Sequence, residues 1–237
     1  MIYLDLGRRE MGKTTLALSL VRRCPSRVLF DPRCQFALGG LTAATYDDVA
    51  AGFDRLADHA APDHVDEFVV APVHDPQTVL VGVMRETRHW VAHSRAPLAV
   101  LLDEVTFVDL MASPDFIYLL RASPRQQLHI ILTAHRPKDI DVNIRAIADE
   151  WLMFRTVQRH DLDAIEERCG EEAVALLPTL APYEYLQWDD ARGKLHRHRP
   201  LTAFARINDA GPTGSASLTG PGDAVVPPSP RLPFDVK

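Results

Sequence analysis

Cysteine is scarce in this 237-residue chain, and the few present exclude two classes of protein. Their number is odd and no two follow a C-x-x-C spacing: Cys24, Cys34 and Cys169. Because secreted scaffolds need paired cysteines and structural zinc sites need closely spaced ligands, we predict neither a disulfide framework nor a zinc site. Buried or unreactive thiols are expected, and redox chemistry has no support.

Long apolar runs and excess positive charge are also missing. No stretch approaches the roughly 18 uncharged apolar residues of a membrane span. A glycine-bounded loop, described below, begins at residue 7, which is too early in the chain for a secretion signal to precede it. We therefore expect a cytosolic protein. With 26 Lys and Arg against 32 Asp and Glu, the net charge of −6 excludes a uniformly basic coat for nucleic acid but permits a local basic lining.

What the sequence does contain is a loop of phosphate-binding type. Gly7, four further residues and then Gly12-Lys13-Thr14 match G-x-x-x-x-G-K-[ST], in which backbone N–H groups wrap polyphosphate oxygens. A strand-like apolar run precedes the loop and an apolar helical pattern follows it, which is the required context. Lys13 is expected to reach the outer phosphates, and the Thr14 hydroxyl to bind Mg²⁺. The predicted nucleotide-binding residues are Gly7, Arg8, Arg9, Glu10, Met11, Gly12, Lys13, Thr14 and Thr15.

Strand and helix patterns alternate from residue 2 to residue 154. Such alternation implies right-handed crossovers and a mostly parallel sheet with helices on both faces, so the predicted fold class is α/β. The predicted strands cover residues 2–4, 27–31, 68–71, 97–102, 128–132 and 151–154. The predicted helices cover residues 15–21, 47–56, 76–93, 113–122 and 139–149.

The pattern changes after residue 154. Helical patterns at 161–169 and 171–177 are followed by two strands, 183–188 and 194–199, which predict an antiparallel hairpin at a sheet edge. Its residues His196 and His198 share one face; a solvated edge strand is favoured, and a metal pair or a DNA contact are the alternatives.

The composition predicts one domain followed by a tail. Residues 208–237 are rich in Gly, Pro and Ser, a composition typical of a flexible tail or of an arm that orders on a partner. Residues 1–207 then form the domain that contains the glycine-bounded loop.

An acidic pair ends the most apolar predicted strand. Asp103 is positioned to hold Mg²⁺ through its water shell, and Glu104 to polarise the water that attacks a phosphate. The alternative for both is a solvated acidic turn. Asp31, at the end of the second strand, is expected either to assist the metal or water or to form an Asp-Pro turn.

A third polar segment follows the strand at 128–132. Because the carboxyl ends of parallel strands meet at one ligand crevice, Thr133 or His135 is placed to sense the γ-phosphate. Together, G-R-R-E-M-G-K-T-T-L, L-A-V-L-L-D-E-V and T-A-H-R-P-K-D-I-D-V-N-I-R-A-I-A-D-E-W-L-M-F-R-T resemble the HerA/FtsK superfamily of DNA-pumping ATPases. The likeness is greatest to the small genome-packaging ATPases of tailless viruses with an internal membrane, and it covers about residues 1–200.

The resemblance implies a RecA-like (ASCE) P-loop NTPase fold and a homo-hexameric ring in which an arginine of one subunit completes the site of its neighbour. The candidates for this arginine are Arg136, Arg145 and Arg155, with Arg145 first. In the family a glutamine usually precedes Arg-Pro; here His135 takes that position, so its hydrogen bonding depends on protonation near neutral pH. Arg8 and Arg9 face solvent or a neighbour by preference, or else the nucleotide.

The predicted function is a Mg²⁺-dependent ATPase that moves double-stranded DNA into a viral capsid through backbone contacts. Its predicted partners are DNA and capsid vertex or portal proteins, in the host cytoplasm and the virion. Because the loop begins at residue 7, we expect no N-terminal barrel and no membrane anchor. The alternatives are a cellular or plasmid DNA translocase of conjugation or partition, and a virion vertex protein that holds ATP without cycling. A kinase fits less well, since it does not need the second carboxylate.

Overall fold

The computed structural model describes residues 1–34, 41–58, 66–72, 74–94, 96–122 and 127–201. The predicted tail at 208–237 lies outside these residues. The strands are β1 (Ile2–Leu6), β2 (Ser26–Phe30), β3 (Leu41–Ala43), β4 (Asp66–Val70), β5 (Leu98–Leu102), β6 (Leu128–Ala134), β7 (Glu150–Phe154), β8 (Tyr185–Asp189) and β9 (Lys194–His198). The α-helices are α1 (Lys13–Val21), α2 (Tyr46–Asp58), α3 (Pro76–His93), α4 (Pro114–Ala122), α5 (Val142–Ile147) and α6 (Arg159–Leu176). Short 3-10 helices are η1 (Val105–Phe107), η2 (Leu110–Ala112), η3 (Pro137–Asp139) and η4 (Leu177–Thr179).

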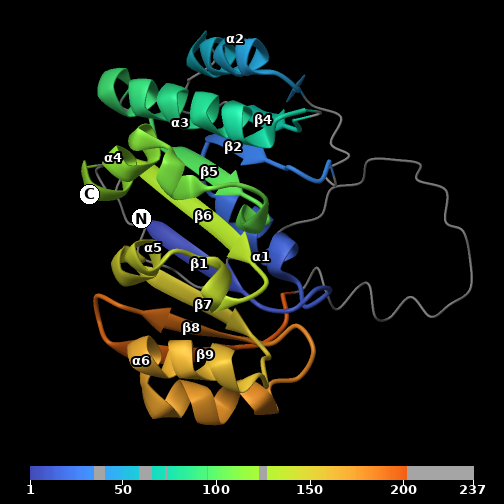
Figure 1. Ribbon diagram of the computed structural model, residues 1–237, viewed down its shortest axis with the longest axis vertical. Coiled ribbons are helices and arrows are strands. Elements are labelled where there is room, and N and C mark those ends of the chain that lie inside the picture. The colour runs from blue at the N-terminus through green and yellow to red at the C-terminus, as the bar shows by residue number, and fades with distance from the viewer. Residues whose placement is uncertain (35–40, 59–65, 73, 95, 123–126, 202–237) are drawn as a thin grey trace, which may run out of the picture.

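The strands of the described residues form one sheet in the order β3-β4-β2-β5-β6-β1-β7-β8-β9 (Figure 1). Every pairing from β3 to β7 is parallel, while β8 and β9 are antiparallel additions at one edge. Both the predicted α/β class and the predicted edge hairpin are confirmed. In this order β6 lies between β1, which leads into the glycine-bounded loop, and β5, which ends at the acidic pair.

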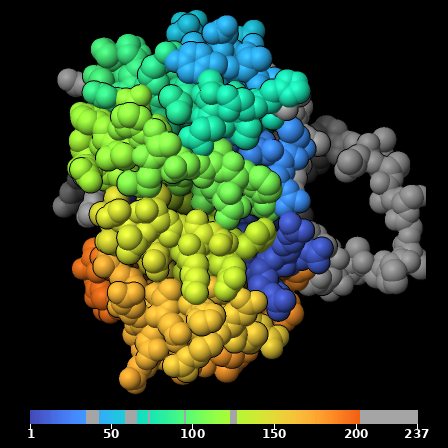
Figure 2. All heavy atoms as spheres, in the orientation of Figure 1, coloured from blue at the N-terminus to red at the C-terminus, as the bar shows by residue number. Residues whose placement is uncertain are grey.

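The sheet is buried on both faces by apolar side chains. One face packs against α1 through Leu16, Ala17 and Val21. The other face carries α2 to α6, and Figure 2 shows α3, α4, α5 and α6 spread over it from teal to orange. Continuous burial explains why β5 and β6 are almost entirely apolar instead of alternating with polar residues.

Helix α3 illustrates how local signals set an element. Asp75 caps its first turn by accepting a hydrogen bond from the backbone N–H of Thr78 at 3.2 Å, and Pro76 occupies the first helical position. One face of the helix is buried, with Val91 partly so: Val79, Leu80, Val83, Met84, Thr87, Trp90 and Val91.

Some boundaries differ from the predictions. Strands β1 and β6 run on to Leu6 and Ala134, which brings the polar residues at their ends into the sheet. The helix predicted at 139–149 is longer than the one observed. Asp141 is the N-cap and accepts a hydrogen bond from the N–H of Asn143, so α5 begins only at Val142, and β7 already starts at Glu150. The sequence did not predict strand β3. The break between the two predicted helices after 169 is confirmed, because Gly170 has a φ of 81° inside α6.

The thiols and the apolar segments agree with the sequence. Cys24 and Cys169 are buried and Cys34 is exposed, all as free thiols. Burial raises the pKa of Cys24 to about 11 and that of Cys169 to about 12, so neither is a reactive thiolate at neutral pH. None of the described helices combines the length and the apolar character that crossing a membrane requires.

One buried histidine makes the stability of the fold sensitive to acid. His129 on β6 stacks on Tyr3 at 6.3 Å between ring centroids, and burial lowers the pKa of His129 to about 4. Between the ordinary pKa near 6.5 and the lowered pKa of about 4, the unfolded chain binds a proton that the folded chain does not. The free energy of unfolding therefore decreases as the pH is lowered through this window.

We expect His129→Phe to remove about 3 kcal/mol of this acid-dependent loss of stability. The measurement is the free energy of unfolding by urea for both proteins between about pH 4 and pH 7. The exposed His160→Gln is the matched control, and equal pH slopes for wild type and His129→Phe would contradict the assignment.

Candidate functional site

The glycine-bounded loop leaves β1 and closes onto the start of α1. Gly7 lies against Phe154 of β7, so that a Cβ at Gly7 would stand 2.7 Å from the Cβ of Phe154. Gly12 caps α1 with a φ of 99°, a conformation that side-chain-bearing residues rarely adopt. Gly7 is thus required by the close approach of Phe154 and Gly12 by its own backbone, and the loop ends at a helix N-terminus whose N–H groups suit an anion.

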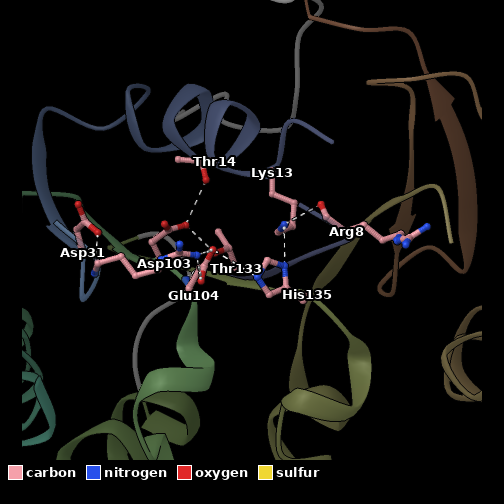
Figure 3. A network of polar contacts seen from close by, with 9 residues as sticks. Arg8, Lys13, Thr14, Asp31, Asp103, Glu104, Thr133 and His135 are labelled. Carbon is pink, nitrogen blue, oxygen red and sulfur yellow. Dashed lines mark hydrogen bonds and ion pairs between the residues drawn. The ribbon is translucent and has the colours of Figure 1, made fainter. Parts of the chain in front are cut away.

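Lys13 is turned inward within this loop. Its Nζ donates a hydrogen bond to the backbone oxygen of Arg8 at 3.1 Å and lies 3.4 Å from Nδ1 of His135 (Figure 3). Burial lowers the pKa of Lys13, opposed mainly by the negative charges of Asp5 and then Glu104. Neither of these direct contacts is to a charged acceptor, so an anionic ligand would offer the ammonium group a stronger one.

Four polar side chains lie in a row across the carboxyl edge of the sheet. Asp5 of β1 is in register with Thr133 of β6, and the pairing of β6 with β5 and of β5 with β2 sets Asp103 and then Asp31 beside it. All four are buried. The row exists because β6 lies between β1 and β5.

Asp103 has the contacts expected of a metal-binding carboxylate. Its Oδ1 accepts a hydrogen bond from Thr133 Oγ1 at 2.7 Å and lies 3.5 Å from Thr14 Oγ1. Its Oδ2 is buried with no hydrogen-bond partner among the described residues. Burial raises the pKa of Asp103, against the hydrogen bond from Thr133. A hydroxyl beside a carboxylate with an unpaired oxygen fits Mg²⁺, which prefers oxygen ligands.

Glu104 is held by both backbone and side chain. Its φ of 46° is in the left-handed region, and its N–H donates to Thr133 Oγ1 at 2.8 Å. Both carboxylate oxygens accept from Nη1 of Arg33 at 2.8 Å, and Oε1 lies 3.4 Å from Nε2 of His135. The carboxylate therefore lies between two nitrogen-bearing side chains.

Lys13, Thr14, Glu104 and His135 share one cavity of about 490 Å³. It is lined by Arg9, Glu10, Gly12, Lys13, Thr14, Thr15, Arg33, Glu104, His135 and Tyr183. Of the predicted nucleotide-binding residues, Gly7, Arg8 and Met11 do not line it. The loop and Glu104 thus line a single space, while Asp103, which does not line it, lies 3.5 Å from Thr14, 89 residues away in sequence.

The three candidate arginines have different surroundings. Arg136 donates from Nε to both oxygens of the buried Asp161 at 3.1 and 3.2 Å, which ties it to α6. Arg155 is exposed beside Arg8, around a hollow of about 160 Å³. Arg145 lies in the last turn of α5, half-buried, with an Nε that has no hydrogen-bond partner among the described residues. None of the three lines the cavity that holds Lys13.

Sequence reasoning missed three residues of this site. Asp5 is fully buried, and neither of its carboxylate oxygens has a hydrogen-bond partner among the described residues. Burial raises the pKa of Asp5, against the charge of Lys13. Its signal was a carboxylate inside an otherwise apolar strand. Arg33 and Tyr183 gave no local signal, because their contacts to the site arise only from the fold.

Two further residues singled out from the sequence have structural contacts. Asp31 accepts a hydrogen bond from the backbone N–H of Arg33 at 3.1 Å, as in the Asp-Pro turn. His198 stacks on Tyr185 with 4.7 Å between ring centroids, and burial, then His196, lowers the pKa of His198. No group of three or more metal-ligating side chains occurs in the part of the chain that the structure describes.

Comparisons with known proteins give matches in structure but not in sequence. No protein-family model matches the chain, and no curated protein matches it either. Among solved structures, the genome packaging NTPase B204 of Sulfolobus turreted icosahedral virus 2, in complex with AMPPCP, aligns with a TM-score of 0.66 and 20% identity over 85% of this chain and 97% of its own.

Two further structures align similarly. The same viral NTPase in complex with ATP-gammaS gives a TM-score of 0.67 and 20% identity over 84% of this chain and 96% of its own. B204, the DNA-packaging ATPase of Sulfolobus turreted icosahedral virus, gives 0.66 and 19% over 84% and 97%. At this level of identity the likeness establishes the fold, and it confirms the P-loop NTPase fold predicted from the three sequence segments.

Proposed function

We propose, from the premise that this chain has the fold of a P-loop NTPase, that it is a Mg²⁺-dependent ATPase that drives double-stranded DNA into a viral capsid. The observation that carries the proposal is the single cavity in which Lys13, Thr14, Glu104 and His135 meet. Each component that phosphoryl hydrolysis needs has a candidate there or beside it.

Binding is assigned to the loop and to α1. Backbone N–H groups from Arg9 to Thr15 cradle the phosphates, and Lys13 exchanges its contact with the Arg8 carbonyl for the outer phosphate oxygens. A phosphate offers Lys13 a charged acceptor in place of a neutral one, so the exchange is favourable.

Thr14 and Asp103 are assigned to the metal. A bound Mg²⁺ supplies positive charge that offsets the charge of the transferring phosphoryl group. Thr133 holds Asp103 Oδ1 at 2.7 Å, which fixes the orientation of the carboxylate toward Thr14.

Glu104 is assigned to the attacking water. Its carboxylate accepts a hydrogen bond from the water and so orients it toward the terminal phosphate. His135 lies within reach of both Lys13 and Glu104 and is assigned to the polar sensor of that phosphate. Arg145 of a neighbouring subunit completes the site, and Arg136 remains a second candidate for that role.

The transport part of the proposal rests on the likeness of fold. The chain aligns with 97% of the length of viral genome packaging and DNA-packaging NTPases. We assign to it the same role, performed by a homo-hexameric ring that contacts the DNA backbone in its channel and docks on capsid vertex or portal proteins, in the host cytoplasm and the virion. The sequence-independent contacts follow because backbone charge, unlike base edges, is the same along the whole genome.

The purified chain is expected to turn over ATP with Mg²⁺ and to do so faster when double-stranded DNA is added. Lys13→Ala is expected to lose nucleotide binding, whereas the exposed Lys194→Ala keeps it. ATP turnover is measured by phosphate release, and movement along DNA by displacement of a protein bound to linear double-stranded DNA. Tight ATP binding without turnover, with DNA present, would replace the proposal by a non-cycling vertex protein. Location of the gene away from capsid genes would favour a cellular or plasmid translocase.

A further inference from the structure

Glu104 is not free to orient water in the structure as it stands. One nitrogen of Arg33, Nη1, bridges both of its carboxylate oxygens at 2.8 Å each. The side chain of Glu104 is 11% exposed and that of Arg33 is 29% exposed, so the pair is partly shielded from water. A charge-assisted contact of this kind is stronger than a neutral hydrogen bond.

The position of Arg33 is fixed by the turn that follows β2. Asp31 binds the N–H of Arg33 through its side chain and the N–H of Cys34 through its backbone oxygen, at 3.1 and 3.2 Å. Asp31 is itself anchored, since its N–H donates to Val70 of β4 at 2.8 Å. The guanidinium therefore reaches Glu104 from a defined backbone and not from a loosely held loop.

Arg33 also lines the cavity that contains Lys13 and Glu104. A triphosphate that enters this cavity brings a second anion to the same guanidinium. The terminal phosphate cannot approach Glu104 closely while both are negative unless a cation lies between them. Arg33 is the cation already in contact with the carboxylate.

We propose that Arg33 is a specificity-determining residue that recognises the terminal phosphate and that, by moving to it, releases Glu104 to orient water. This inference rests on the proposed function. Without a terminal phosphate Arg33 stays on Glu104 and the attacking water has no base. A diphosphate lacks the group for which Arg33 leaves the carboxylate, so binding of the two nucleotides differs through this side chain.

The release leaves Glu104 with a remaining neighbour. His135 Nε2 lies 3.4 Å from Oε1 on the carboxylate, while its Nδ1 faces Lys13. A buried carboxylate that lost its only polar neighbour would be strongly disfavoured. The arrangement therefore permits two positions of Arg33 without isolating Glu104 in either one.

The test is a double-mutant cycle read by nucleotide binding and not by turnover. Kd is measured by calorimetry for ADP and for a non-hydrolysable ATP analogue, with the full chain. Arg33→Gln is expected to weaken the analogue about tenfold or more and to leave ADP within about twofold. Glu104→Gln, which releases Arg33 before nucleotide binds, is expected to strengthen the analogue about tenfold.

The cycle separates this effect from mere loss of a negative charge. In the Arg33→Gln background, the gain produced by Glu104→Gln is expected to vanish, because no arginine remains to be released. A gain of equal size in both backgrounds would overturn the inference, as would an unchanged preference for the analogue in Arg33→Gln.

Two controls complete the design. Arg85→Gln removes a similar arginine–glutamate contact, to Glu86 at 2.7 Å on α3, and is expected to change neither Kd. Because a single nitrogen of Arg33 bridges Glu104, a lysine can replace it, and Arg33→Lys is expected to keep the preference for the triphosphate that Arg33→Gln loses. A variant that merely failed to fold would not keep it. If the wild type binds neither nucleotide, both the proposed function and this inference fail; if it binds both without coupling, only the inference fails.

Discussion

Glu104→Gln is expected to lower ATP turnover by about 10²–10⁴-fold although the variant binds the triphosphate at least as tightly as the wild type. The amide has nearly the shape of the carboxylate, so the left-handed backbone at φ 46° and the contact of the Glu104 N–H with Thr133 need not change. What is lost is the negative charge that polarises the attacking water. The measurement is phosphate release at saturating ATP with Mg²⁺.

The matched control is Glu86→Gln. Glu86 is also a partly buried glutamate in contact with an arginine, but it lies on α3 outside the cavity. It is expected to leave turnover unchanged. Turnover by Glu104→Gln equal to that of the wild type would remove Glu104 from the role of orienting water, whatever the effect on stability.

Arg145→Ala is expected to lower turnover by about 10³–10⁵-fold, the range seen when an arginine finger is removed. Arg145 is favoured over Arg136 because Arg136 is engaged by the buried Asp161, whereas Nε of Arg145 has no hydrogen-bond partner among the described residues. The position of Arg145 on α5, away from the cavity of its own chain, suits action on a neighbour.

A mixing experiment distinguishes action on a neighbour from action within one subunit. A Lys13→Ala subunit lacks a working phosphate loop but still offers Arg145, and an Arg145→Ala subunit offers the loop. Recovery of turnover on mixing the two inactive variants is therefore expected. Full activity of Arg145→Ala alone would eliminate it as the finger, and Arg121→Ala, an exposed arginine on α4, is the control.

Much of the fold was predictable because its signals are local. The loop from Gly7 to Thr14 is recognised by spacing alone, although Gly7 is required by the close approach of Phe154 and only Gly12 by its own backbone. The central strands β5 and β6 are recognised as continuous apolar runs. The hairpin of β8 and β9 follows from two strands and a short turn, and the break at Gly170 from the glycine itself.

Element ends were less predictable. The apolar pattern ends β6 at residue 132 because Thr133 and Ala134 add no strong apolar signal, yet pairing with β1 on one side extends the strand to Ala134. Strand β3 spans only Leu41–Ala43 and is defined by its pairing with β4, which no short window of sequence contains.

The sequence by itself determined the α/β class, the phosphate loop and the acidic pair, because turn chemistry and apolar periodicity act over a few neighbouring residues. Only the tertiary structure decided that β6 lies between β1 and β5, and hence that Thr133 holds Asp103. It alone brought Arg33 onto Glu104, 71 residues away, and engaged Arg136 with Asp161. Such contacts depend on strand order and on the closure of long loops, which are properties of the whole chain and not of any segment of it.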